Sequence, residues 1–180
     1  MQGANDVLLE VILGGTAELN VSGSVLDGHV IIESGSTGTV NLLNGSVLTG
    51  RLENVETLSV SSAAQWVMVE DSTLQNLEMG SGGGVRFGQP GDFYTLSVGE
   101  LSGNGTFYME ADFSKGQSDH LEVTGTAKGQ HEIVVQASGS DPLSDGSLHL
   151  VHIADGDAQF ELQGGEVDLG TWSYGLKPVS

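Results

Sequence analysis

Short apolar pairs recur along the first hundred residues at nearly constant intervals, and this feature most constrains the fold. In each pair two apolar residues flank one other residue, at Leu19/Val21, Val40/Leu42, Leu58/Val60, Leu77/Met79 and Leu96/Val98. The steps between successive pairs are 21, 18, 19 and 19 residues. Self-similarity with a period near 20 residues is the signature of a solenoid, in which each repeat is one coil lying on the last.

The local patterning predicts strands, because helical periodicity is nearly absent and alternation is frequent. A second repeat supports stacked coils: Ser22–Gly28 (SGSVLDG) recurs 22 residues later as Asn44–Gly50 (NGSVLTG). Strands without intervening helices, in coils of about 20 residues, predict an all-β fold, a right-handed parallel β-helix with three short strands per coil. Leucine-rich repeats share this period, but their recurring asparagine is missing here.

Stacked coils bring equivalent side chains into register about 4.8 Å apart, the spacing of hydrogen-bonded strands. We therefore expect one residue from each apolar pair to lie above the next inside the coil. The predicted β-helix ladder consists of Leu19, Val40, Leu58, Leu77 and Leu96.

Charge and cysteine content limit the function classes. The chain carries 24 Asp and Glu against 5 Lys and Arg, a formal net charge of -19, and the basic residues are scattered. Nucleic-acid binding is excluded, since a phosphate backbone requires clustered cations. An acidic chain without cysteine fits a bacterial exported protein that crosses the oxidising periplasm. No signal peptide or membrane span is visible, so we interpret the chain as an internal piece of a larger exported protein.

The composition of the sequence changes near residue 88, where glycine-rich segments flank Val85–Phe87 and aromatic residues become more frequent. Asn104-Gly105 and Lys128-Gly129 are hairpin-like turn signals. We therefore expect two regions: parallel β-helix coils over 1–95 and a hairpin-rich C-terminal cap over 96–178. A cap protects the strand edges that an open β-helix end exposes to aggregation.

The C-terminal blocks carry a family resemblance. They are LSGNGTFYMEADF (Leu101–Phe113), GQSDHLEVTGTAKGQHEIVV (Gly116–Val135), LHLVHI (Leu148–Ile153) and FELQGGEVDLGTWSYGL (Phe160–Leu176). In this order, from Leu96 to Lys177, they resemble the pertactin-like or autochaperone region of type V autotransporter passengers. The first 95 residues resemble the family only through their β-helical repeat.

The resemblance implies a passenger carried to the bacterial surface by a C-terminal membrane barrel, where it stays or is secreted. It also implies that this region helps the passenger fold as it emerges. The expected partners are the chain's own upstream passenger, the barrel, the outer-membrane assembly machinery, and a host surface or a second copy. The full protein is expected to be an adhesin or virulence factor.

Residues of two kinds are assigned to the cap. The folding core of the cap comprises Leu101, Phe107, Met109, Leu121, Val123, Val135, Phe160, Leu162, Trp172, Tyr174 and Leu176. Its turns are assigned to Gly103, Gly105, Gly116, Asp119, Gly129 and Gly170.

Ser118, Asp119 and His120 are the three residue types of a hydrolytic triad. Neighbouring side chains in a strand point to opposite faces, so adjacent residues cannot form a nucleophile–base relay. We expect instead a turn at Lys115–Ser118, with Asp119 accepting hydrogen bonds from nearby backbone amides. No catalytic residue is expected.

Metal and cofactor sites are not expected either. His149 and His152 lie three apart in a strand, hence on opposite faces. Asp155/Asp157 and Glu70/Asp71 lack the glycine-rich repeat of calcium coils. Trp172 and Tyr174 share a strand face, which we interpret as packing rather than sugar binding.

Two alternatives to a non-catalytic folding module remain. One is a self-associating or host-binding adhesive surface formed by the Thr- and Ser-rich coil faces. The other is a β-helical carbohydrate-active enzyme with a carboxylate row at Glu33, Glu53, Glu56 and Glu70, whose plainer interpretation is a solubilising surface.

Overall fold

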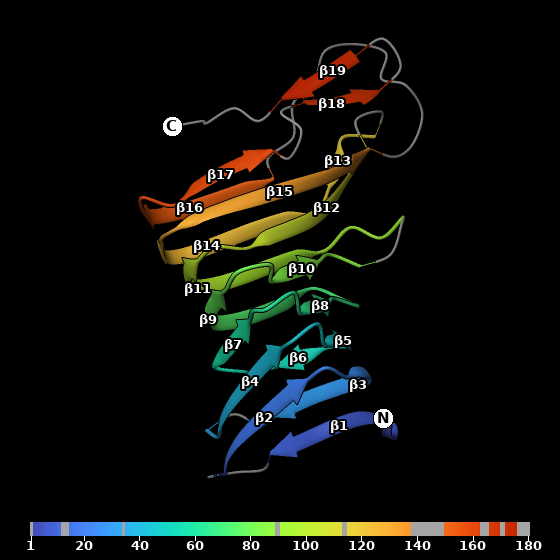
Figure 1. Ribbon diagram of the computed structural model, residues 1–180, viewed down its shortest axis with the longest axis vertical. Coiled ribbons are helices and arrows are strands. Elements are labelled where there is room, and N and C mark those ends of the chain that lie inside the picture. Colours follow the sequence, from blue (N-terminus) through green and yellow to red (C-terminus); the bar gives the residue numbers. More distant parts are fainter. Residues whose placement is uncertain are drawn as a thin grey trace.

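The computed structural model is an elongated stack of strands running from β1 at one end to β17 near the other (Figure 1). It describes residues 2–11, 15–33, 35–88, 91–112, 115–137, 150–162, 166–169 and 172–175. Within these residues the chain forms strands and turns, so no helix there is long and apolar enough to cross a membrane.

Two long sheets form the walls of the stack. The first has the order β1 (Gln2–Val11), β3 (Val25–Ile32), β5 (Val47–Thr49), β8 (Gln65–Val67), β10 (Gly84–Arg86), β12 (Thr106–Asp112), β15 (Gln130–Ala137) and β17 (Gln159–Leu162). In it β6 (Leu52–Glu53) also pairs with β3, and β13 (Gln117–Ser118) with β12. The second has the order β16 (Val151–Gly156), β14 (His120–Ala127), β11 (Thr95–Gly103), β9 (Ser72–Met79), β7 (Thr57–Val60), β4 (Thr37–Leu43) and β2 (Thr16–Ser22).

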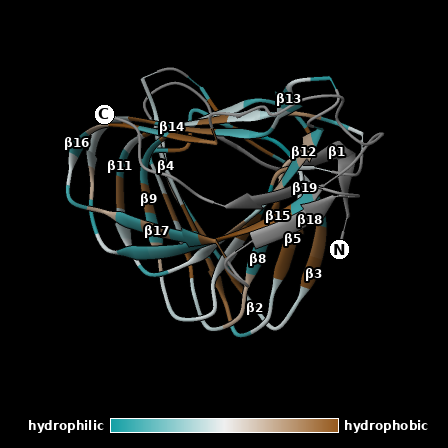
Figure 2. Cartoon of the chain, turned by 90° about the horizontal axis from the view of Figure 1, so that it is seen from above, coloured by the Kyte–Doolittle hydropathy of each residue, from teal (hydrophilic) through white to brown (hydrophobic). Residues whose placement is uncertain are grey.

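The chain alternates between these sheets, and successive coils pair in parallel, as in β2 with β4 and β10 with β12. Figure 2, seen from above, shows the coils superposed around a common interior. The predicted all-β parallel β-helix is confirmed.

Three paired segments per coil are present, but two of them are often joined into one bent strand. In β11, Leu96–Val98 pairs with the first part of β9, and Leu101–Gly103 pairs with the last part. The register of β11 against β14 shifts between these two parts. The bend falls at Gly99, where a Cβ would press on the backbone oxygen of Gln75, so glycine permits the close approach. β3 bends in a similar way, pairing first with β5 and then with β6.

The ladder predicted from sequence holds for its first four members and is wrong for the fifth. Leu19 lies opposite Val40, Val40 opposite Leu58, and Leu58 opposite Leu77. Leu77 then lies opposite Leu101. Leu96 belongs to another side of the coil, opposite Ser72 and Leu121.

The error arises because the coil lengthens before β11, at a corner where the chain passes from the first sheet to the second. The connection before β9 spans residues 68–71, whereas the one before β11 spans 87–94. Apolar spacing in the strands does not record the length of such a connection. A constant period therefore selected Leu96 instead of Leu101.

The expected hairpins at Asn104-Gly105 and Lys128-Gly129 are also corrected. Each dipeptide lies at a corner of the solenoid, between strands of different sheets. Glycine serves both a hairpin turn and a coil corner, so the turn residues alone do not distinguish the two. Among the strand pairs that the structure describes, the antiparallel ones are β12–β13 and β18 (Glu166–Leu169) with β19 (Trp172–Gly175). Parallel pairing thus continues past residue 95 as far as Leu162.

The interior is one continuous apolar column. It includes the ladder residues Val40, Leu58 and Leu77, all fully buried. Trp66 is also fully buried, and its Nε1–H donates to the Gly50 carbonyl at 3.0 Å, which satisfies the only polar atom of the indole.

Candidate folding site in the C-terminal coils

The residues assigned to the folding core from sequence fall into three groups. Those that are buried in the interior are Leu101, Phe107, Met109, Leu121 and Val123. Those that are partly buried against it are Val135, Phe160 and Leu162. Trp172 and Tyr174 lie in β19, whose backbone pairs with β18, while Leu176 lies outside the described residues.

Aromatic rings connect successive coils in this region. The ring centroids of Phe87 and Phe107 lie 6.3 Å apart at an interplanar angle of 62°. Phe107 contacts both His131, at 5.7 Å, and Phe160, at 6.3 Å. His131 and Phe160 stack at 5.4 Å. We call these four residues the ring column. Each such contact stabilises by about 0.5–1.5 kcal/mol beyond area burial.

His131 is the polar member of the ring column, and sequence reasoning missed it. Its side chain is 2% exposed, and Nε2–H donates to the Lys128 carbonyl at 2.9 Å. Burial lowers the pKa of the imidazole, so the ring is neutral at pH 7. The available signal was alternation, because His131 shares the inward face of β15 with Ile133 and Val135.

Asp119 is a structural acceptor that joins coils. The side chain is 1% exposed, Oδ1 accepts from Tyr94 N–H at 2.8 Å, and Oδ2 accepts from Glu110 N–H at 2.7 Å. The prediction that Asp119 accepts from backbone amides is confirmed, but these amides are not nearby in the sequence, since the donors lie 25 and 9 residues away.

The pKa of Asp119 is raised to about 6, chiefly because burial penalises the charged carboxylate. The nearby carboxylates of Glu110 and Asp92 raise it further, whereas the two backbone N–H donors act in the opposite direction. The charged form is therefore held by good hydrogen bonds in a poorly solvated site.

Two further carboxylates tie the connection at 87–94 to the coils. Glu110, 8% exposed, accepts from Gly91 N–H through both oxygens at 2.9 and 3.1 Å. Asp71 accepts from Thr95 N–H at 2.8 Å. We call Asp71, Glu110 and Asp119 the carboxylate clamps. Together they fix the path of the chain at the corner where the coils lengthen.

Ser118 and His120 do not assemble with Asp119 into a relay. Ser118 lies in β13 and pairs with Ala111 of β12. His120 Nε2 contacts Glu122 Oε2 at 3.1 Å, and His152 Nδ1 contacts Glu122 Oε1 at 2.6 Å. These two contacts lower the pKa of Glu122. Among the side chains that the structure describes, no group of three His, Cys, Asp or Glu is arranged to hold a metal ion, and His149 lies outside them.

The predicted turn glycines occupy distinct environments. Gly103 and Gly129 have φ of +89° and +96°, and a Cβ on either would overlap a backbone oxygen of the preceding coil. At Gly105 a Cβ would meet the Met79 side chain, and at Gly116, with φ of +69°, it would meet open space. Gly170 lies outside the described residues.

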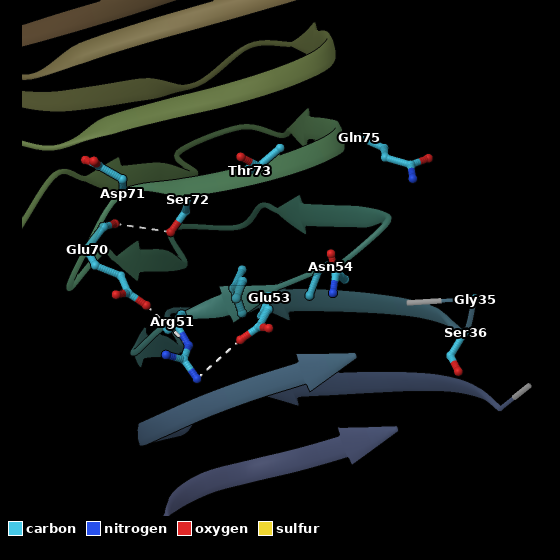
Figure 3. Close-up of a pocket in the computed structure, with 12 residues that line it drawn as sticks. Gly35, Ser36, Arg51, Glu53, Asn54, Glu70, Asp71, Ser72, Thr73 and Gln75 are labelled. Atoms are coloured by element: carbon cyan, nitrogen blue, oxygen red, sulfur yellow. Dashed lines mark hydrogen bonds and ion pairs between the residues drawn. The ribbon is translucent and has the colours of Figure 1, made fainter. Parts of the chain in front are cut away.

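A shallow groove of about 500 Å³ crosses the upstream coils (Figure 3). Arg51 lies within it, 3.3 Å from a Glu53 oxygen and 3.2 Å from a Glu70 oxygen. Two carboxylates of the predicted row are therefore paired with one guanidinium. Such half-exposed ion pairs contribute little to stability.

Comparisons with known proteins point to one family. A family model described as Pertactin matches residues 74–179. The chain is 36% identical over 160 residues to the autotransporter adhesin/invasin TibA of Escherichia coli O78:H11, covering 82% of this chain and 16% of TibA. It is 35% identical over 159 residues to the BrkA autotransporter of Bordetella pertussis, covering 84% of this chain and 15% of BrkA.

A solved structure shares the fold. The crystal structure of the Haemophilus influenzae Hap adhesin superposes with a TM-score of 0.66 at 24% sequence identity. The match covers 91% of this chain and 21% of that one. This chain thus spans about a sixth of the length of TibA and BrkA.

Proposed function

We propose a function for this chain from its family: the chain belongs to the pertactin family, and it is a passenger region of an autotransporter displayed on or released from the bacterial surface. Within it, residues 96–178 act as the folding nucleus, and the upstream coils form on them. The observation that carries this proposal is that most members of the ring column and the carboxylate clamps lie within residues 96–178, namely Phe107, Glu110, Asp119, His131 and Phe160.

The physical basis is the cost of starting a solenoid. A first coil must order about 20 residues before its strands have a partner, whereas each later coil pairs at once with an existing edge. Contacts within the C-terminal coils lower that initial cost by adding ring stacking and charge-assisted bonds to the backbone pairing. Once these coils exist, their exposed strand edge offers hydrogen-bonding groups to the coil before them.

Two fully buried residues allow a matched test, Phe107 in the ring column and Val40 in the upstream ladder. If the C-terminal coils form first, Phe107→Ala should slow refolding, while Val40→Ala should mainly accelerate unfolding. Stopped-flow refolding from urea measures both rates.

Hydrogen exchange in stepwise urea should show amides of β12, β14 and β15 protected longer than those of β2 and β4. Slower refolding of Val40→Ala than of Phe107→Ala, or the reverse order of exchange, would refute the proposal.

We also propose that this region is not catalytic. In support, Asp119 is engaged by backbone amides, and His120 is directed to Glu122. Hydrolysis of a peptide or glycan substrate by the purified chain, abolished by Asp119→Ala, would contradict this.

For the full-length protein we propose an adhesive or virulence role and export with a membrane-embedded translocator. TibA is named an adhesin/invasin and Hap an adhesin, which supports the role in adhesion. A strain that adheres to host cells equally well with and without the full-length protein would contradict it.

A further inference from the structure

We propose that His131 makes the C-terminal coils sensitive to acid, because protonation of its buried imidazole destabilises the packing of the ring column. This adds a regulatory property to the proposed folding role and depends on that role only for its biological meaning. The acid sensitivity itself follows from the position of one side chain.

The hydrogen bonding of His131 leaves one nitrogen without a partner. Nε2 uses its proton to bond the Lys128 carbonyl at 2.9 Å. Nδ1 is buried and has no hydrogen-bond partner among the residues that the structure describes. A second proton would have to sit on Nδ1, which creates a buried N–H donor and a charge without a nearby acceptor.

The described strands beside the imidazole, β12 and β17, supply no compensating charge. β12 and β17 present the rings of Phe107 and Phe160, at 5.7 and 5.4 Å. Ring faces attract a cation, but less strongly than the water that burial removes. The ionisable groups nearest to His131 in the sequence, Lys128 and Glu132, are exposed.

Ionisable groups on the two packed strands are also directed elsewhere. On β12, Glu110 bonds Gly91 N–H, and Asp112 Oδ1 accepts from Lys115 N–H. On and beside β17, Glu161 and Asp157 are exposed. In the contacts that the structure describes for His131, a protonated imidazole would therefore face the rings of Phe107 and Phe160 and the Lys128 carbonyl.

The direction of the pH effect follows from linkage. Burial lowers the pKa of His131 below the value near 6.5 of an unfolded histidine, so the unfolded chain takes up the proton first. Below pH 6.5 the folded state loses stability by up to about tenfold in the unfolding constant per pH unit. Asp119 acts in the opposite direction, because its raised pKa, about 6, makes the folded state bind a proton more readily. A variant of His131 alone separates the two effects.

The experiment compares wild type, His131→Phe and Phe87→Leu by urea unfolding at pH 7.5 and pH 5.0. Phenylalanine preserves the ring at position 131, while Phe87→Leu perturbs the ring column without removing an ionisable group and serves as the control. Relative to His131→Phe, the wild type should lose up to about thirtyfold in its folding constant between the two pH values. The Phe87→Leu variant should keep the wild-type pH dependence. An unchanged pH dependence in His131→Phe would overturn the proposal.

A second measurement covers the case in which His131→Phe does not fold. In the native wild-type chain, the NMR signal of the His131 Cε1 proton should titrate at a lower pH than the histidine signals of the urea-unfolded chain. A native His131 that titrates near pH 6.5 or above would overturn the proposal. The order of refolding tests the folding role, and it is independent of both the urea unfolding of the variants and the NMR titration of His131.

Discussion

At the scale of single residues, Asp119 is a side chain whose removal we expect to destabilise the contact between coils. Asp119→Ala leaves the N–H groups of Tyr94 and Glu110 without their acceptor. Unmet buried donors cost about 1–3 kcal/mol each, and relief of a buried charge offsets part of this, so we expect a loss of about 2 kcal/mol at pH 7. Urea unfolding measures it, with the exposed Asp157→Ala as control.

The pH dependence of that loss has a defined sign. The pKa of Asp119 is about 6 in the folded chain and 3.8 as its ordinary value, so the folded state binds the proton more readily between these values. The contribution of Asp119 to stability therefore falls as pH rises through 6, and the Asp119→Ala deficit should be larger at pH 5 than at pH 7. A deficit that grows from pH 5 to pH 7 would show that hydrogen bonding to the charged form dominates.

Sequence reasoning at this scale identified residue types better than their partners. It assigned Asp119 a backbone-bonding role, but the donor at Tyr94 is 25 residues away, and no local pattern specifies that distance. It passed over His131, because histidine is intermediate in burial and its residue type alone does not indicate a buried position. The buried position follows from Phe107 and Phe160, which only the stacking of coils brings beside it.

At the scale of elements, the corner glycines give a matched pair of substitutions. A Cβ on Gly129, at φ of +96°, would overlap the backbone oxygen of Gly103 in the coil before it. Gly116 has φ of +69° but open space around it. Gly116→Ala should therefore cost about 1–2 kcal/mol from backbone strain alone. Gly129→Ala should cost more, on the order of 3 kcal/mol or loss of folding, because the coils must also separate.

Urea unfolding and far-ultraviolet circular dichroism distinguish these outcomes. Equal losses for Gly116→Ala and Gly129→Ala would mean that the coil spacing at this corner relaxes freely, contrary to the close contact in the structure.

The strands also show which part of the repeat can be predicted from the sequence. Apolar pairs predicted Leu19, Val40, Leu58 and Leu77 as vertical neighbours because the upstream connections are short and nearly constant. Leu96 was misplaced once the connection at 87–94 lengthened the coil, since a surface excursion leaves the strand pattern unchanged. Among the described residues, Gly105, Gly116 and Gly129 lie between strands, but the sequence did not distinguish a solenoid corner from a hairpin turn.

At the scale of the whole molecule, the dominant property is charge, with 24 acidic residues against 5 basic ones. The solenoid holds these charges closer together than the unfolded chain does, so their mutual repulsion opposes folding. Among the described side chains, Arg51 is paired with Glu53 and Glu70, but a single paired guanidinium offsets little of a net charge of -19.

This repulsion predicts a salt effect of defined sign. The screening length falls from about 30 Å at 0.01 M to about 8 Å at 0.15 M ionic strength. We therefore expect NaCl in that range to raise the free energy of unfolding by about 1 kcal/mol, since long-range repulsion is screened more than short contacts. Urea is the denaturant of choice because guanidinium is itself a salt.

Calcium chloride at matched ionic strength should act no differently from NaCl. A larger stabilisation by calcium would indicate specific binding, and a loss of stability with NaCl would show that attractive ion pairs outweigh the repulsion.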